Sequence, residues 1–375
     1  MNAFLNPSIV VLGKRLEGRQ QSGLLRKLPV PHTLLDFCSN DYLGFSSSES
    51  LQQQFSIAKQ TYGNAPLGAT GSRLLTGNSI FAEDLEQHIA NVQGQQAALL
   101  FNSGYTANLG LFSCLPQKGD TIITDELIHC SVIDGCRLSF GKRLKFKHND
   151  LSSLEEKLKM SSGICFVAIE SVYSMDGDLA PLLEINTLCQ KYGALLIVDE
   201  AHAFGVFGKG LVHLTGLTEQ VFAVLITFGK ALGAHGAIIL GSRLLRNYLI
   251  NFARSFIYST AMSFSQLLYI QMAYQFLQNQ EELTITLQYK IRLFHSCLSQ
   301  VKEVENHRSA VHAVIIPGNS SAYKASRLLS EQGFAVHPIL SPTVPIGKER
   351  LRICLHSYNT DEDIKRLCHF LINAL

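Results

Sequence analysis

The hydrophobic positions between residues 80 and 240 alternate between short, almost continuous apolar runs and amphipathic stretches. The apolar runs predict buried strands at residues 97–101, 121–124, 164–170, 195–199, 223–227 and 236–240. The amphipathic stretches predict helices at 80–92, from Thr106 onward, at 131–138 and at 185–192. Buried strands separated by helices are typical of an α/β protein with a mainly parallel sheet. Ligands of such proteins bind beyond the carboxyl ends of the strands.

The pattern changes towards both ends of the chain. Residues 8–27 predict a helix that ends before Pro29, and residues 36–44 predict a short strand that runs into a polar turn. After a long helical stretch at 263–303, the pattern predicts strands at 310–316, 334–338 and 351–355, a helix at 321–332, and a last helix opened by Thr360 with Asp363 as its capping partner. We therefore expect an N-terminal segment at 1–45, a large domain at 46–284 and a small α+β domain at 285–375.

Composition narrows the class of protein. Of the 375 residues, 46% are apolar and 17% are charged, and 32 basic and 30 acidic residues leave a formal charge of +2. This balance argues against nucleic acid and membrane surfaces as partners, and no apolar run approaches the length of a membrane span. The nine cysteines have no metal-ligand spacing. We therefore expect reduced thiols, no metal site and a cytoplasmic location.

Two phrases at the ends of predicted strands carry reactive side chains, Val198-Asp199-Glu200-Ala201-His202 and Thr227-Phe228-Gly229-Lys230-Ala231-Leu232-Gly233. Lysine amines form imines with carbonyl compounds, and pyridoxal phosphate requires a lysine for its aldehyde and an acid opposite its pyridine nitrogen. Lys230 and Asp199 are candidates for these two roles. One alternative is that Lys230 is an ordinary solvent-exposed lysine at the start of a helix. Another is a helicase that holds magnesium with Asp-Glu-Ala-His, but the chain has no G-x-x-x-x-G-K-[ST] phosphate loop.

Small residues occupy the point where the strand at 97–101 is expected to pass into a helix, in the phrase Asn102-Ser103-Gly104-Tyr105-Thr106. The first turn of a helix has backbone N–H groups without acceptors in the helix, and these groups bind phosphate. This phrase is therefore a candidate phosphate site. The alternative is an ordinary turn between a strand and a helix.

Seven phrases together resemble the α-oxoamine synthases, which are pyridoxal-phosphate enzymes of the aspartate-aminotransferase fold (fold type I). They lie at residues 39–44, 71–74, 103–105, 129–131, 174–178, 199–202 and 227–233, and so extend over most of the chain. The resemblance implies a large α/β domain with a small α+β C-terminal domain, and pyridoxal 5'-phosphate as the cofactor.

The resemblance also implies roles for individual residues at the cofactor. Lys230 would hold the cofactor covalently, with Thr227, Gly104 and Tyr105 near its phosphate group. Asp199 would pair with the protonated pyridine nitrogen and so keep the ring an electron sink. Lys230, Asp199 and His129 would be the catalytic residues.

Further positions match the ring and the substrates. His129 corresponds to an imidazole stacked on the ring, His202 to one that bonds the ring hydroxyl, and Ser174 to another cofactor contact. Each of these three could also be an ordinary structural residue. Arg352 resembles the clamp for the amino-acid carboxylate, a role suited to a guanidinium. The resemblance also places Arg26, Asn40 and Thr343 near the substrates. It implies a substrate contact for His129 in addition to its contact with the ring.

The implied reaction is a decarboxylating condensation of an amino acid with an acyl thioester, in which the freed Lys230 amine removes the α-proton. Residues 40–44, 342–347 and 350–352 favour the member of the biotin pathway, which joins L-alanine to a pimeloyl group on coenzyme A or an acyl carrier protein. Another member, which condenses glycine with a short acyl-CoA, is the alternative within the family. A cofactor-free scaffold is the alternative outside catalysis, and the presence of both Lys230 and Asp199 argues against it.

Residues 258–263 resemble the segment through which relatives reach the phosphate site of a partner subunit, so we expect a homodimer. Two departures from the family pattern are present. The usual proline after Thr260 is missing, and residues 64–67 break the expected glycine-rich loop. Both departures concern the acyl entrance and the dimer interface rather than the cofactor site.

Overall fold

The computed structural model describes residues 7–26, 28, 33–63, 65–298 and 308–374. The chain forms two compact units: unit 1 is Met1–Asp36 with Ile315–Leu351, and unit 2 is Phe37–Val314 with Arg352–Leu375. The boundary between them falls inside strand β9 (Val311–Ile315) and next to Arg352 in strand β12 (Arg350–Cys354). The division into domains at residues 45 and 284 remains a prediction.

Unit 2 contains a seven-stranded sheet in the order β2-β8-β7-β6-β5-β3-β4. Its strands are β2 (Ala97–Phe101), β3 (Thr121–Asp125), β4 (Lys142–Phe146), β5 (Cys165–Glu170), β6 (Leu195–Asp199), β7 (Ala223–Thr227) and β8 (Ala237–Gly241). Only β8 runs antiparallel to its neighbours β2 and β7. The predicted α/β fold with a mainly parallel sheet is therefore confirmed.

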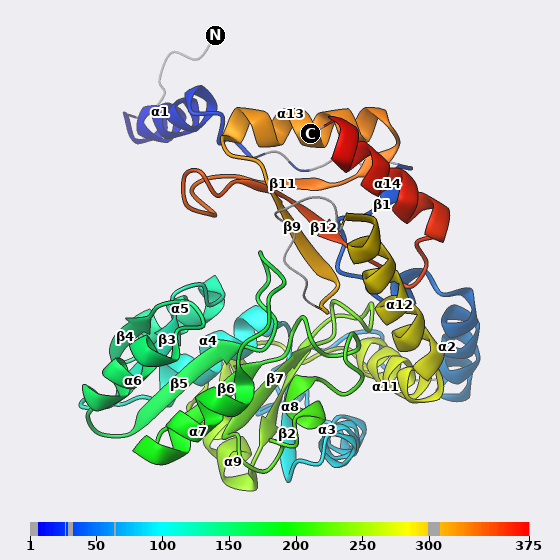
Figure 1. The fold of residues 1–375 in the computed structure, drawn as a ribbon. Helices are drawn as coiled ribbons and strands as arrows, with labels where there is room; N and C mark the ends of the chain where they lie inside the picture. The colour runs from blue at the N-terminus through cyan, green and yellow to red at the C-terminus, as the bar shows by residue number, and fades with distance from the viewer. Residues whose placement is uncertain (1–6, 27, 29–32, 64, 299–307, 375) are drawn as a thin grey trace. The chain divides into compact units, whose positions relative to one another are not determined.

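Helices lie on both faces of this sheet (Figure 1). They include α3 (Ile80–Val92), α4 (Gly104–Cys114), α5 (Cys130–Leu138), α6 (Leu151–Lys159), α7 (Leu182–Tyr192), α8 (Leu211–Leu214), α9 (Arg243–Phe252) and α10 (Arg254–Ile257). The apolar faces of α4, α5, α9 and α10 pack in one core cluster with the buried sheet residues Leu99, Ile122 and Leu225. Burial of this kind contributes roughly 25 cal/mol per Å² of apolar surface, so the core holds the strand ends in fixed positions.

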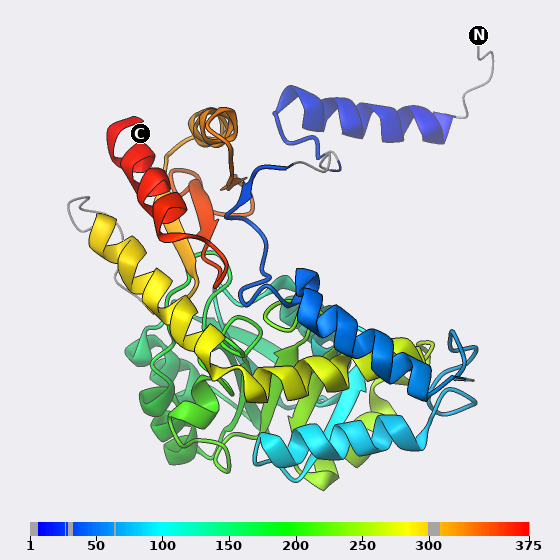
Figure 2. The same cartoon turned by 90° about the vertical axis from the view of Figure 1, so that its right-hand side faces the viewer.

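Further helices belong to unit 2. Helix α2 (Glu49–Thr61), after the short turn η1 (Phe45–Ser47), runs beside α11 (Phe264–Asn279), as Figure 2 shows. Helix α12 (Glu281–Leu298) packs on α14 (Asp361–Ala374). The hydroxyl of Thr360 accepts a hydrogen bond from the Asp363 backbone N–H, which confirms the predicted cap of α14.

Unit 1 contains α1 (Pro7–Gln21), α13 (Asn319–Glu331) and β11 (His337–Ile339), and its strands β1 (Leu35–Asp36) and β10 (Phe334–Ala335) pair in parallel. The prediction that the first helix reaches residue 27 is wrong. The helix ends at Gln21 because Gly23 adopts a left-handed φ of 70° and the N–H of Leu24 turns back to the Arg19 carbonyl. Residues 27, 29, 64 and 299–303, on which other predictions fall, lie outside the described residues.

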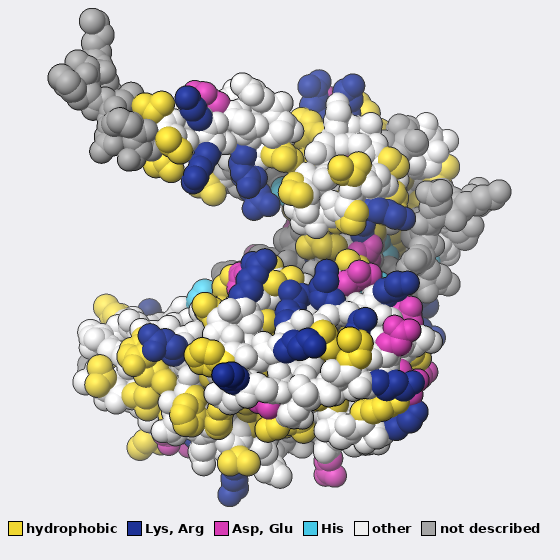
Figure 3. All heavy atoms as spheres, turned by 90° about the vertical axis from the view of Figure 1, so that its left-hand side faces the viewer, with side chains coloured by type: hydrophobic (Ala, Val, Ile, Leu, Met, Phe, Trp, Pro, Cys, Tyr) yellow, Lys and Arg dark blue, Asp and Glu magenta, His cyan; other side chains and the backbone are white. Residues whose placement is uncertain are grey.

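On the face drawn in Figure 3, charged side chains are spread over the surface rather than gathered in one block. The Lys and Arg side chains of the described residues are interspersed there with uncharged ones. Among the helices that the structure describes, none combines the length and the apolar character needed to cross a membrane.

Candidate active site

The carboxyl ends of β6 and β7 open into a cavity of about 250 Å³ that lies wholly in unit 2. Most of the predicted site residues line it, although they come from distant parts of the chain: Asn40, Gly104, Tyr105, His129, Asp199, His202, Thr227 and Lys230. The other lining residues are Ser103, Asn108, Ser131, Glu170, Ala201, Gly229, His235 and Gly236. The cavity lies where a parallel sheet is expected to bind its ligand.

Two further predicted residues are joined to the cavity by hydrogen bonds within unit 2. Arg352 donates from Nε to the Ser174 carbonyl oxygen over 2.7 Å and from Nη2 to Asn40 Oδ1 over 3.0 Å. Arg26 and Thr343 lie in unit 1, in the coil after α1 and in the turn after β11, and both are exposed. Their roles at the substrate remain predictions.

Asp199 ends β6 and is held by two donors. Its Oδ1 accepts from the Ala201 backbone N–H over 3.0 Å, and its Oδ2 accepts from Asn108 Nδ2 over 2.9 Å. Asn108 lies on α4 and also donates to Ser131 Oγ over 3.0 Å. A buried carboxylate bonded on both oxygens keeps one orientation, which suits a group that must face a ligand atom.

His129 is the N-cap of α5, and Ser131 orients its ring. Its Nδ1 accepts from the backbone N–H of Ser131 over 3.3 Å and lies 2.7 Å from Ser131 Oγ. Burial lowers the pKa of His129, although the negative charge of Asp199 acts in the opposite direction. The neutral ring therefore carries its proton on Nε2.

Lys230 follows the end of β7 by three residues, and its side chain lines the cavity. Burial lowers the pKa of Lys230 to about 8, although the carboxylates of Asp199 and Glu170 oppose this shift. An amine with a pKa near 8 is partly neutral at physiological pH and can act as a nucleophile or a base.

Glu170 is a candidate site residue that the sequence analysis missed. It ends β5, pairs with Asp199 in the parallel register, and is 2% exposed. Its Oε1 has no hydrogen-bond partner among the described residues. Burial, reinforced by Asp199, raises the pKa of Glu170 to about 8. The available signal was a carboxylate at the end of an apolar run, the same signal that marks Asp199.

The other end of the cavity fits an anion. Ser103 caps α4, because its Oγ accepts from the Thr106 backbone N–H over 3.1 Å. A Cβ on Gly104 would come within 2.4 Å of Thr227 Cγ2, so a larger residue would crowd this turn. Thr227 Oγ1 is buried without a partner among the described residues. An unpaired hydroxyl beside a helix N-terminus is what a phosphate group would satisfy.

Tyr105 follows Gly104 in the first turn of α4 and is 43% exposed. Its hydroxyl donates a hydrogen bond to the Asp134 carboxylate, and this bond raises the pKa of Tyr105. The phenol is thereby held in one position at the rim of the cavity.

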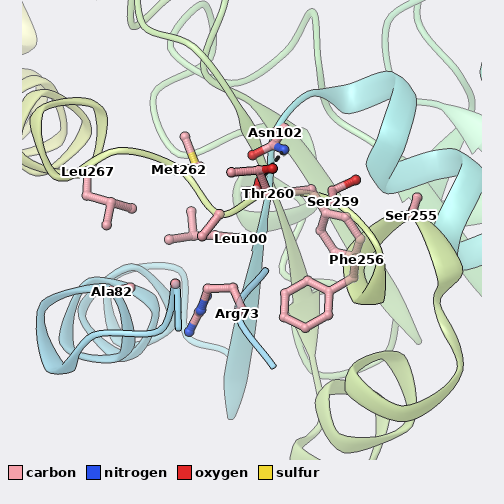
Figure 4. Close-up of a pocket in the computed structure, with 13 residues that line it drawn as sticks. Arg73, Ala82, Leu100, Asn102, Ser255, Phe256, Ser259, Thr260, Met262 and Leu267 are labelled. Carbon is pink, nitrogen blue, oxygen red and sulfur yellow. Dashed lines mark hydrogen bonds between the residues drawn. The ribbon is translucent and has the colours of Figure 1, made fainter. Parts of the chain in front are cut away.

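A second pocket of about 20 Å³ adjoins the segment at 258–263. Figure 4 shows Asn102 and Thr260 joined across it, and Asn102 Nδ2 donates to the Thr260 carbonyl oxygen over 2.9 Å. Arg73 on its wall is paired with Glu86 over 2.5 Å. The pocket has room for about one water molecule, which is too little for a substrate. The bond between Asn102 and Thr260 attaches the segment at 258–263 to the end of β2.

Four similarities to known proteins agree with this geometry, two in sequence and two in structure. The sequence matches the family Aminotransferase class I and II over residues 32–371. An 8-amino-7-oxononanoate synthase from Emericella nidulans is 42% identical over 385 residues, which covers 95% of this chain and 93% of that protein.

Two solved structures share the fold. A serine palmitoyltransferase from S. paucimobilis with bound PLP has a TM-score of 0.87 and 25% identity, with 98% of this chain and 97% of that one covered. An 8-amino-7-oxononanoate synthase from Francisella tularensis has a TM-score of 0.76 and 28% identity, with 90% and 97% covered. The predicted fold type I architecture is therefore confirmed.

Proposed function

The chain belongs to the class I and II aminotransferase family and, within it, to the family of 8-amino-7-oxononanoate synthases, and from this we propose that it condenses L-alanine with a pimeloyl thioester. The products are 8-amino-7-oxononanoate, carbon dioxide and the free thiol, and the reaction is a step of biotin biosynthesis. The observation that carries the proposal is the cavity in which Lys230, Asp199 and the unpaired Thr227 hydroxyl meet.

The cofactor is pyridoxal 5'-phosphate, and the described residues fit it. Lys230 would hold its aldehyde, Asp199 its ring nitrogen, and Thr227 with the first turn of α4 its phosphate group. His129 and His202 would contact the ring. When bound, pyridoxal phosphate supplies an electron sink for the electrons released at the α-carbon of the amino acid.

The residues around this cofactor site would bind and orient the amino acid. The Arg352 guanidinium, with Asn40 bonded to its Nη2, would hold the carboxylate. The Lys230 amine, whose pKa burial lowers to about 8, would take the α-proton. Arg26 and Thr343 are proposed to contact the substrates, and Ser174 the cofactor.

A homodimer is part of the proposal, and the surface around the segment at 258–263 supports it. Thr260 forms a β-bridge with Ser72, so this segment lies against the turn at 71–77. Apolar side chains near both are exposed, namely Tyr258 at 73%, Leu74 at 50%, Leu75 at 80% and Ile80 at 79%. Exposed apolar patches of this kind mark protein interfaces. Sedimentation should give a dimer, and a fully active monomer would contradict this part of the proposal.

The second candidate function is another α-oxoamine synthase that takes glycine and a short acyl-CoA. Initial rates with L-alanine or glycine, each paired with pimeloyl-CoA, a pimeloyl carrier protein or acetyl-CoA, separate the two. The methyl group of alanine contributes about 1 kcal/mol when buried, so glycine should react but about fivefold less efficiently. A faster reaction of glycine with acetyl-CoA would favour the second candidate. The same panel identifies the acyl carrier, and the cytoplasmic location remains a prediction.

A further inference from the structure

Tyr42 connects two parts of the active site, the Arg352–Asn40 pair and His202. It is fully buried in the polar turn after β1. Its hydroxyl donates to Asn40 Oδ1 over 3.1 Å and lies 2.7 Å from His202 Nδ1. Asn40 Oδ1 also accepts from Arg352 Nη2 over 3.0 Å. Four side chains of unit 2 therefore form one continuous hydrogen-bonded chain from the guanidinium to the imidazole.

The chemistry of the donors decides where the protons lie in this chain. Asn40 Oδ1 can only accept, and Arg352 fixes the amide orientation because a guanidinium can only donate. The hydrogen between Tyr42 and Asn40 must therefore belong to the phenol. With that hydrogen committed, the phenol oxygen accepts from His202, so Nδ1 of His202 carries a proton.

The protonation states are consistent with this arrangement. Burial lowers the pKa of His202 well below its usual value, so the imidazole is neutral and has one proton. Burial also raises the pKa of Tyr42, so the phenol stays protonated. Once the single proton of His202 is on Nδ1, its Nε2 is left as a hydrogen-bond acceptor.

We propose that Tyr42 is a positioning residue that fixes His202 in the Nδ1-protonated form and joins it to the Arg352–Asn40 pair. His202 then presents Nε2 as an acceptor for the ring hydroxyl of the cofactor. This inference rests on the proposed function for the cofactor, because the hydroxyl belongs to pyridoxal phosphate, but it does not depend on which amino acid or acyl donor reacts.

The first test needs no turnover. The full-length protein, freed of cofactor and labelled with ¹⁵N in histidine, is studied by NMR at neutral pH, with the His202 signals assigned by their loss in His202→Gln. The expected result is a protonated Nδ1 and an unprotonated Nε2. A proton on Nε2 would overturn the proposal.

The second test compares two phenol deletions. Tyr42→Phe should weaken the affinity of the cofactor-free protein for pyridoxal phosphate about tenfold, since it leaves the buried Nδ1–H of His202 unpaired. The variant should also contain both tautomers of His202. Tyr274→Phe is the matched control, because Tyr274 is also buried and accepts a hydrogen bond from Gln93 Nε2 over 2.6 Å, but does not line this cavity. The control should keep wild-type affinity.

Wild-type affinity and an unchanged tautomer in Tyr42→Phe would refute the positioning role. If Tyr42→Phe does not fold, the tautomer in the unmodified protein still decides the matter. Because both readouts are taken without amino acid or acyl donor, a failure of the proposed substrates would leave them unaffected. A failure of the proposed reaction and a failure of this inference are therefore distinguishable.

Discussion

The two ends of the active-site cavity differ in how their buried polar atoms are satisfied. At the end that contains Asp199, both carboxylate oxygens of Asp199 have donors, and Asn40 Oδ1 accepts from both Tyr42 and Arg352. At the end formed by Thr227 and the first turn of α4, the buried Thr227 hydroxyl has no partner among the described residues. Because buried polar groups are normally paired, the first end is organised by the fold itself. The second end marks where a bound molecule supplies the missing partners.

The largest effect is expected from Lys230, which lines the same cavity. Lys230→Ala should lower turnover at least about 10³-fold, because the covalent anchor and the base are lost together. The visible absorbance of the bound cofactor should disappear as well. The exposed Lys209 provides a control, and Lys209→Ala should keep both turnover and colour. An active Lys230→Ala enzyme would be incompatible with the proposed site.

Asp199→Asn tests the organised end. The amide can keep the shape of the side chain, but it no longer stabilises a protonated ring nitrogen. The variant should bind pyridoxal phosphate in a one-to-one ratio and lose turnover about 10²-fold, as expected when a preorganised charge is removed. Absorbance titration and initial rates measure the two effects. A wild-type rate would mean that Asp199 only supports the fold.

Thr227→Val tests the unsatisfied end. The Thr227 hydroxyl is proposed to form a hydrogen bond with the phosphate group of the cofactor. Its loss should therefore weaken the affinity for pyridoxal phosphate about tenfold. The matched control is Thr187→Val, because the Thr187 hydroxyl only bonds the Leu183 carbonyl of its own helix, over 2.8 Å. Titration of the cofactor-free proteins gives the affinities. Equal affinities in the two variants would remove Thr227 from the phosphate site.

The smallest effect is a shift in pH dependence. The neutral amine is the form that attacks an aldehyde, and burial lowers the pKa of Lys230 to about 8. The rate at which cofactor-free protein takes up pyridoxal phosphate covalently should therefore rise with pH and level off above about pH 8, below the value of about 10.4 for a free lysine. Stopped-flow absorbance measures this profile.

Glu170→Gln sharpens the same comparison. The Glu170 carboxylate, where ionised, acts to raise the pKa of Lys230. Its removal should move the midpoint of the profile to lower pH. A midpoint that stays in place would show that Glu170 does not act on the amine, and a wild-type midpoint near 10 would contradict the burial of Lys230.

Much of the fold could be predicted because buried strands have a plain signature. The predicted limits of β2, β6 and β7 match the structure, since their residues are apolar almost throughout. Strand β4 was missed because it lies at an edge of the sheet and has two exposed lysines, Lys142 and Lys145, among its five residues. Edge strands commonly carry such charges, which hide them from a search for apolar runs.

The site was predictable only where a short phrase follows a strand. Asp199, Thr227 and Lys230 could be located in this way. Asn108 could not be located in this way, because its bond to Asp199 joins residues 91 positions apart. No local sequence pattern indicates such a bond. The link between Tyr42 and His202 depends in the same way on tertiary packing.

The most direct test of the proposed reaction follows the carboxyl carbon of the amino acid. The purified protein with pyridoxal phosphate is given a pimeloyl thioester and L-alanine labelled with ¹³C at the carboxyl carbon, and the products are analysed by mass spectrometry. The expected result is labelled carbon dioxide together with unlabelled 8-amino-7-oxononanoate. Retention of the label in the product, or no product while glycine and acetyl-CoA react, would contradict the proposed function.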